Sequence, residues 1–218
     1  MRCVHRRSRV FCAPRGAFFR HPRAGQGELV DAVILFADLR DFTAHTAPLD
    51  PVGTVRLLND YFDCLVGPIE EYRGHVLKFI GDAVLAFFPL LPEGPEPEPL
   101  EAVQTLRKRL AQLNRARRGS GEPPIRHGLC LHFSQVLYGN VGSSERLDFT
   151  IIGQAVNVAA RGVDATRTLD ADYLFTGDFV ELSLLNTWYA AETLAFPAGA
   201  EYRLPHVHDR PSPSLSTP

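Results

Sequence analysis

The chain has 218 residues, of which 45% are hydrophobic and 22% are charged, and its formal net charge at pH 7 is −2. These values are typical of a globular protein with one large domain, with or without tails, and the charge gives no support for nucleic-acid binding. No apolar run reaches the roughly 18–20 residues of a membrane span, and the cysteines lack CxxC or other metal-ligand spacing, so we expect a cytoplasmic protein with reduced thiols.

Residues 1–28 form the first predicted segment. Residues 1–27 hold seven arginines and no acidic residue. A secretory signal would need an apolar core of about 7–15 residues after the basic start, and none is present. We expect a disordered arm or linker; a basic arm that contacts anionic lipid or RNA, and a transit peptide, are the alternatives.

Residues 29–205 alternate between strand-like and helix-like patterns, and we expect them to form one domain. The continuous apolar run from Ala32 to Ala37 is typical of a strand buried on both faces. A helix is predicted next, with Asp50 as its N-cap and Pro51 in its first turn. Its apolar residues recur every three or four positions until Gly74, which we expect at the C′ position.

The rest of the domain is predicted to contain paired strands and further helices. Residues 75–88 indicate a hairpin with a tight turn, and the apolar period from Leu100 to Leu113 indicates a second long helix. The remaining expected elements are strands at about 125–133, 135–141 and 147–152, a helix at about 154–165, a strand near 173–175, a helix near 177–185 and a strand near 200–204. Residues 206–218 are polar and rich in Pro and Ser, so we expect a disordered tail.

The order of these elements defines the expected fold class. Strands and hairpins interrupted by two long helices imply a mixed sheet with helices packed on it. We therefore expect an α+β fold with a ferredoxin-like βαββαβ core, a mixed and mainly antiparallel sheet, and helices on one side of that sheet.

Two acidic residues stand where predicted strands end or turn. Asp38 follows the buried strand, and Asp82 lies at the turn of the hairpin. Such aspartates are common in ordinary turns, but two carboxylates that converge on one sheet edge need a cation or repel each other. Carboxylates bind hard cations such as Mg²⁺, and two such ions about 3.5–4 Å apart can drive displacement at phosphorus. The pair therefore predicts an enzyme that acts on a nucleoside triphosphate.

Four other polar residues are candidates for substrate contacts. Lys78 precedes Asp82 by four residues, about 13 Å along an extended strand, which is too far for both to contact one phosphate group. Asn157 and Arg161 are neighbours on one helix face, where an amide can orient a sugar and a guanidinium can stabilise charge at phosphorus. Simpler interpretations stay open: a strand-edge lysine, a solvated helix face, and for Thr150 an ordinary β-branched strand residue.

Four motifs follow one another along the chain. They are LFADLRDFT at residues 35–43, VLKFIGDAVLAF at 76–87, YGNVG at 138–142 and LDFTIIGQAVNVAAR at 147–161. Each motif alone is moderately specific, but the four in this order resemble the class III nucleotidyl cyclase catalytic domain over about residues 30–165. The resemblance implies a lyase of intracellular signal transduction, an adenylate cyclase that converts ATP to 3′,5′-cyclic AMP and pyrophosphate by attack of the ribose 3′-OH on the α-phosphate.

The resemblance also implies how the metals and the triphosphate are bound. In the family, the positions of Asp38 and Asp82 bind two Mg²⁺ or Mn²⁺ ions, together with the backbone carbonyl at the position of Leu39. Phe42 and Thr43 belong to a segment whose backbone N–H groups approach the triphosphate.

The base and the ribose are implied to contact other residues. Lys78 and Thr150 match the purine-contacting positions, and this pair is typical of adenylyl members and of the subclass with bicarbonate-responsive bacterial enzymes. Asn157 matches the position that orients the ribose, and Arg161 matches the one that stabilises the pentavalent transition state. Family sites lie at a head-to-tail dimer interface, with the acids from one chain and these four residues from the other. The resemblance therefore implies a homodimer that is inactive as a monomer, and a separate sensor or regulatory partner is expected.

Three positions depart from the family pattern. Asp41 and Ser134 stand where the family usually has glycine, and only Arg203 is a candidate for a late triphosphate-binding lysine found in some members. The main alternative is a catalytically weak nucleotide-binding or dimerising regulatory domain. A diguanylate cyclase or polymerase-like relative shares only the Gly81-Asp82 turn, and the chain has no GxxxxGK[ST] sequence of a P-loop NTPase.

Overall fold

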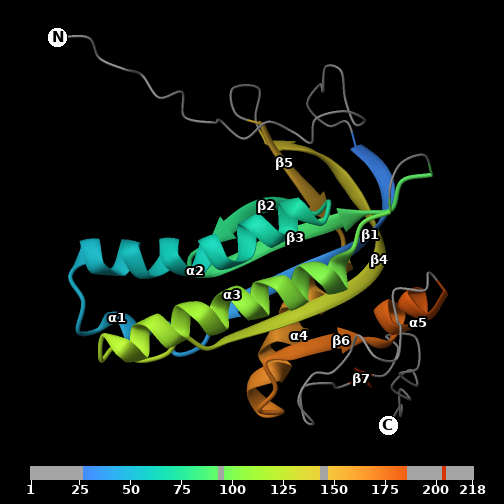
Figure 1. Ribbon diagram of the computed structural model, residues 1–218. Coiled ribbons are helices and arrows are strands. Elements are labelled where there is room, and N and C mark those ends of the chain that lie inside the picture. The colour runs from blue at the N-terminus through green and yellow to red at the C-terminus, as the bar shows by residue number, and fades with distance from the viewer. Residues whose placement is uncertain (1–26, 93–95, 143–146, 186–202, 205–218) are drawn as a thin grey trace, which may run out of the picture.

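The computed structural model describes residues 27–92, 96–142, 147–185 and 203–204 (Figure 1). The strands are β1 Gly27–Leu39, β2 His75–Ile80, β3 Ala83–Pro89, β4 His127–Gly142, β5 Leu147–Ile152, β6 Tyr173–Thr176 and β7 Arg203–Leu204. The helices are α1 Phe42–Thr46, α2 Pro51–Glu71, α3 Pro99–Gly119, α4 Gln154–Thr168 and α5 Gly177–Leu185. The tail predicted at 206–218 and almost all of the arm predicted at 1–28 lie outside the described residues, but residues 27 and 28 belong to β1.

The strands form one mixed sheet. Its order is β2-β3-β1-β4-β6-β7, and β5 pairs with β4 beyond this path. The β1–β3, β1–β4, β2–β3 and β4–β5 pairs are antiparallel, whereas the β4–β6 and β6–β7 pairs are parallel. The predicted α+β fold with a mixed, mainly antiparallel sheet is therefore confirmed.

Strand β4 is one long strand and not the two strands that the sequence predicted at 125–133 and 135–141. The position taken for a break, Ser134, is paired with Ala32 in an uninterrupted register along β1. From Leu137 to Gly142, the same strand also pairs with β5. The long β4 therefore pairs with β6 near its start and with β5 near its end, and it joins these two parts of the sheet.

Helices cover both faces of the sheet, so the prediction of helices on one side is wrong. Val33 and Leu35 of β1 belong to the core under α2 and α3, whereas Ala32 and Ile34 belong to a second core that includes α4 residues. Figure 1 shows α2 and α3 in front of the sheet and α4 behind β4. A strand that is apolar on both faces needs cover on both faces to remove its side chains from water.

Helix α2 begins as predicted and ends one residue earlier than predicted. The carboxylate of Asp50 accepts a hydrogen bond from the Gly53 N–H at 2.6 Å. At the other end, the residue with positive φ is Arg73 (φ 67°), and the N–H of Gly74 donates to the Ile69 carbonyl at 2.7 Å. Gly74 is thus at C″ of a Schellman motif. A Cβ there would lie 2.6 Å from the Phe88 ring, so close packing explains this glycine.

A short helix, α1, was not predicted. It follows β1 directly, and its N-cap Asp41 has left-handed backbone angles (φ 56°, ψ 33°) without a side-chain cap hydrogen bond. Within the described part of the chain, every helix is too short or too polar for a membrane span.

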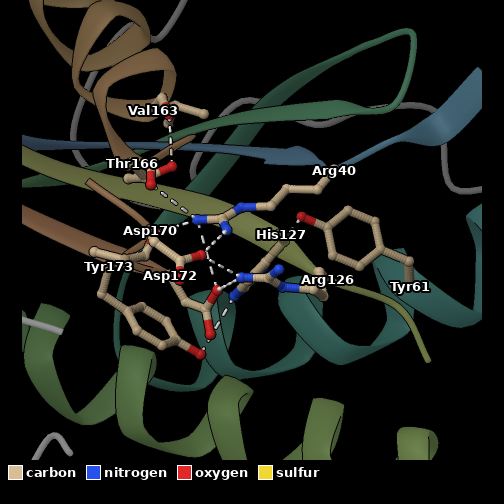
Figure 2. Close-up of polar contacts among 10 residues, drawn as sticks. Arg40, Tyr61, Arg126, His127, Val163, Thr166, Asp170, Asp172 and Tyr173 are labelled. Carbon is tan, nitrogen blue, oxygen red and sulfur yellow. Dashed lines mark hydrogen bonds and ion pairs between the residues drawn. The ribbon is translucent and has the colours of Figure 1, made fainter. Parts of the chain in front are cut away.

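A buried histidine lies between the sheet and the α2–α3 layer. His127 is 1% exposed, and its two ring nitrogens lie 3.3 Å from the hydroxyls of Tyr61 and Tyr173 (Figure 2). Burial, with a smaller contribution from Arg40, lowers the pKa of His127 to about 3. The imidazole is therefore neutral in the folded protein at every pH near neutrality.

We predict that His127 makes the fold sensitive to acid. In the unfolded chain its pKa is about 6.5, so below that pH the unfolded state binds a proton that the folded state excludes, and the free energy of unfolding falls by up to about 1.4 kcal/mol per pH unit. Urea unfolding between pH 7 and pH 4.5 should show this slope reduced in His127→Gln. Parallel pH profiles for the two proteins would contradict the assignment.

Candidate active site

An open pocket of about 440 Å³ lies where β1 ends. Its lining residues are Asp38, Leu39, Asp41, Phe42, Thr43, Ala44, Asp82 and Arg167. They come from the end of β1, from α1, from the β2–β3 turn and from the last turn of α4. Three segments that are distant in the sequence therefore meet at one edge of the sheet.

Strand register brings the two predicted acids together. Ala37 of β1 pairs with Val84 of β3, so the next residue of β1, Asp38, lies level with the turn that carries Asp82. Burial, the negative charge of Asp82 and a hydrogen bond with Asp82 together raise the pKa of Asp38 to about 6, although the positive charge of Arg167 opposes this rise. The predicted convergence of Asp38 and Asp82 on one edge is confirmed, although their role in metal binding stays a prediction.

The oxygens at this edge suit a hard divalent cation. Among the described residues, no group of three or more His, Cys, Asp or Glu side chains could hold a metal ion. The available donors are the carboxylates of Asp38 and Asp82, with the backbone carbonyl of Leu39 beside them. Mg²⁺ is commonly bound through one or two carboxylates and completes its shell with water and substrate phosphates. An incomplete all-oxygen set of this kind therefore fits Mg²⁺ or Mn²⁺ that arrives with a nucleotide.

Helix α1 forms the side of the pocket where the sequence predicted the triphosphate. Phe42 and Thr43, the two residues predicted to bind substrate here, both line the pocket. The first N–H groups of a helix have no acceptor within the helix, so they are available to an anion. Asp41 also lines the pocket and is exposed, which adds a negative charge on the same side.

Arg167, which the sequence analysis missed, supplies a positive charge to the pocket. Its Nη2 donates to Asp38 Oδ2 at 3.2 Å and to the Leu39 carbonyl at 3.3 Å. It lies in the last turn of α4, beyond residue 165, where that helix was predicted to end. An arginine near the C-terminus of a longer α4 was the only signal in the sequence, and such residues are common at helix ends.

Arg40 holds the end of α4 beside the end of β1, and the sequence analysis did not identify it either. Its side chain is buried, and its guanidinium donates to the backbone carbonyls of Thr166 (3.2 Å) and Ala171 (Figure 2). It also lies 3.8 Å from Asp170 and 3.6 Å from Asp172. These contacts fix the backbone on both sides of Arg167.

Lys78 and Thr150 do not line the pocket; they lie on two strands, β2 and β5, that contact each other. Lys78 on β2 forms a 3.3 Å ion pair with Asp148 on β5. Thr150 is two residues further along β5, so its side chain is on the same face as that of Asp148. The two predicted purine-contacting residues are thus on strands that contact each other without pairing in the sheet, and Asp148 lies between them as a residue that the sequence did not single out.

Asn157 and Arg161 lie on the exposed surface of α4 and do not line the pocket. Arg167 is six positions after Arg161, which places their side chains about 120° apart around the helix axis. Because Arg167 points to the acids of its own chain, Arg161 points elsewhere. The predicted site residues therefore form two groups in one chain, and only the metal and triphosphate group surrounds the pocket.

Comparison with known proteins identifies the family. The model of the family described as the adenylate and guanylate cyclase catalytic domain matches residues 26–168. An adenylate cyclase from Anabaena cylindrica is 33% identical over 172 residues, which are 77% of this chain and 33% of that protein. The chain thus spans about a third of the length of this curated relative.

Solved structures give the same result. A bacterial light-regulated adenylyl cyclase has a TM-score of 0.63 and 34% identity, covering 72% of this chain and 45% of that one. The guanylyl cyclase Cya2 has a TM-score of 0.56 and 30% identity, covering 64% of this chain and 72% of that one. The resemblance that the four motifs indicated is confirmed: the chain belongs to the class III adenylate and guanylate cyclase catalytic domain family.

Proposed function

We propose that this domain is an adenylate cyclase that converts ATP to 3′,5′-cyclic AMP and pyrophosphate in intracellular signalling. The observation that carries the proposal is the convergence of Asp38 and Asp82 at one sheet edge beside the Leu39 carbonyl. Family membership and similarity to adenylate cyclases support the reaction type. We place residues 29–205, with the start of β1, in the catalytic domain, and we propose that it acts in the cytoplasm with a separate sensor or regulatory partner.

We assign the metal-binding role to Asp38, Asp82 and the Leu39 carbonyl, which would hold two Mg²⁺ or Mn²⁺ ions. When bound, such ions make a hydroxyl more acidic and neutralise phosphate charge. The first N–H groups of α1, at Phe42 and Thr43, would bind the triphosphate beside them. The chain's own contribution at this edge is therefore to fix the α-phosphate and to orient the oxygens around it.

We assign base recognition to Lys78 and Thr150. The Watson–Crick edge of adenine presents an acceptor nitrogen beside an amino donor. An ammonium can only donate, whereas a hydroxyl or a carboxylate can accept, so Lys78 together with Thr150 or Asp148 is complementary to that edge. The 3.3 Å ion pair keeps the Lys78 ammonium at this position before a nucleotide binds.

We propose that a second copy of the chain completes each site. Asn157 and Arg161 are exposed and lie away from the pocket of their own chain, so they would orient the ribose and stabilise the transition state of the neighbouring chain in a head-to-tail homodimer. Exposed apolar side chains elsewhere on the chain are available to such an interface: Phe79 and Ile80 next to the β2–β3 turn, with Leu137, Val141 and Ile152 on β4 and β5.

The decisive measurement is product formation from ATP and from GTP with Mn²⁺. We expect cyclic AMP from the wild type and a loss of at least about 100-fold in kcat for Asp82→Asn, because the variant loses a carboxylate that would hold the metal ions, whose charge would stabilise the transition state. Asp31→Asn, an exposed aspartate at the other end of β1, should retain activity. Cyclic GMP as the main product would refute the Lys78/Thr150 assignment, and no product from either nucleotide would favour a regulatory domain.

A complementation experiment tests the shared site. We expect Asp82→Asn and Arg161→Ala to be inactive alone and to recover activity when mixed, because a mixed dimer has one site without either substitution. Random pairing in a two-fold dimer gives such sites at about a quarter of the wild-type number. Two inactive variants that remain inactive after verified subunit exchange would show that each chain uses its own residues.

Asp41 is predicted to weaken substrate binding. Its left-handed backbone angles suit glycine or asparagine, so Asp41→Gly and Asp41→Asn should both fold. Each removes one negative charge from the pocket and should lower the KM for ATP by about two- to fivefold, the effect of an exposed charge at close range. A lower KM in the glycine variant alone would assign the effect to the backbone and not to the charge.

A further inference from the structure

Arg167 occupies the position that the proposed metal site requires for a cation. One nitrogen atom, Nη2, lies 3.2 Å from Asp38 Oδ2 and 3.3 Å from the Leu39 carbonyl. These are two of the three oxygen-bearing groups assigned to the metals, and they come from consecutive residues. The guanidinium therefore contacts oxygens of two residues that would hold a divalent ion.

We propose that Arg167 is a built-in competitor for the divalent cation, so that it sets the metal affinity of the site before a nucleotide binds. This inference rests on the proposed function, because it assumes that Asp38 and Leu39 bind metal. A cation that coordinates Asp38 Oδ2 and the Leu39 carbonyl must first displace the Nη2 group. Part of the free energy of metal binding is then used to break two charge-assisted contacts.

The surroundings of Arg167 allow its guanidinium to be displaced by a cation, and they do not favour a permanent structural role. Arg40 anchors the flanking backbone through the carbonyls of Thr166 and Ala171, so the start of the side chain is fixed. The side chain itself is 53% exposed, which leaves its end free to move. A displaced guanidinium would remain in the pocket, where a triphosphate offers it new acceptors.

The same arrangement explains why metal and nucleotide would bind together. The metal alone must remove Arg167 without compensation. If ATP bound as well, its phosphates would offer acceptors to the displaced guanidinium and ligands to the metal, so both charges would keep a partner. Arg167 is thus a positioning residue that links occupation of the metal site to the presence of a polyanion.

The inference is tested by direct metal binding without nucleotide. Titration of the purified full chain with Mn²⁺, with free Mn²⁺ measured by electron paramagnetic resonance, gives the dissociation constant. We expect Arg167→Gln to bind Mn²⁺ about two- to fivefold more tightly than the wild type, the range that an exposed ion pair provides. A merely structural role would leave that constant unchanged or weaken binding.

Arg126→Gln is the matched control. Arg126 is also 53% exposed and pairs with Asp170 and Asp172 close to Arg40, but it does not line the pocket. An equal gain in both variants would show that net charge, and not competition, controls the affinity. Saturating Mg²⁺ should also shift the side-chain N–H signal of Arg167 in NMR spectra and leave that of Arg126 in place; an unmoved Arg167 signal would refute displacement.

Failure of this inference can be separated from failure of the proposed function. Asp82→Asn should weaken Mn²⁺ binding in both the wild-type and the Arg167→Gln background. If Asp82→Asn has no effect, the metal assignment itself is wrong. If Asp82→Asn weakens binding but Arg167→Gln leaves it unchanged, the metal site stands and the competition is refuted.

Discussion

The site depends on the burial of β1 on both faces. Antiparallel pairing on its two edges, with β3 and with β4, fixes its position along the sheet, and apolar side chains on both faces prevent a shift in register. A one-residue slip would exchange the two faces, so that side chains packed under α2 and α3 would have to fit the core beside α4 and the reverse. The level of Asp38 relative to the β2–β3 turn is therefore set by the hydrophobic core, and the core holds two carboxylates together at its edge.

Positive charges balance this edge in two different ways. Arg40 is buried and bound to backbone carbonyls, which are fixed acceptors, so it acts as part of the scaffold. Arg167 is half-exposed and bound to Asp38, whose pKa of about 6 reflects the cost of keeping a buried carboxylate charged beside Asp82. A long exposed side chain lowers that cost without closing the pocket. Separate residues thus provide the stability of the fold and the charge balance of the site.

The sequence predicted those features that depend on local pattern. The period of α2, its Asp50 cap and the β2–β3 hairpin could be predicted because each is specified within a few residues of the chain. Asp38 and Asp82 could be paired because both lie at strand ends that a hairpin brings together. Arg40 and Arg167 could not be found in this way, because their partners are more than 120 residues distant and depend on how α4 packs. The long β4 was divided because Ser134 resembles a break unless its pairing with β1 is known.

The placement of α4 has consequences for the proposed dimer as well as for the single chain. The pattern of β1 already indicated burial on both faces, and only a helix opposite α2 and α3 satisfies that pattern; α4 is this helix. Its position brings Arg167 to the acids of its own chain and directs Arg161 about 120° away. In the proposed homodimer, one rigid helix would therefore contact two sites, with its last turn at one and its exposed face at the other. Arg40 binds the end of this helix to the end of β1. The acids of one site and the Arg161 that serves the other site would therefore be held in place by the same packed elements, β1 and α4.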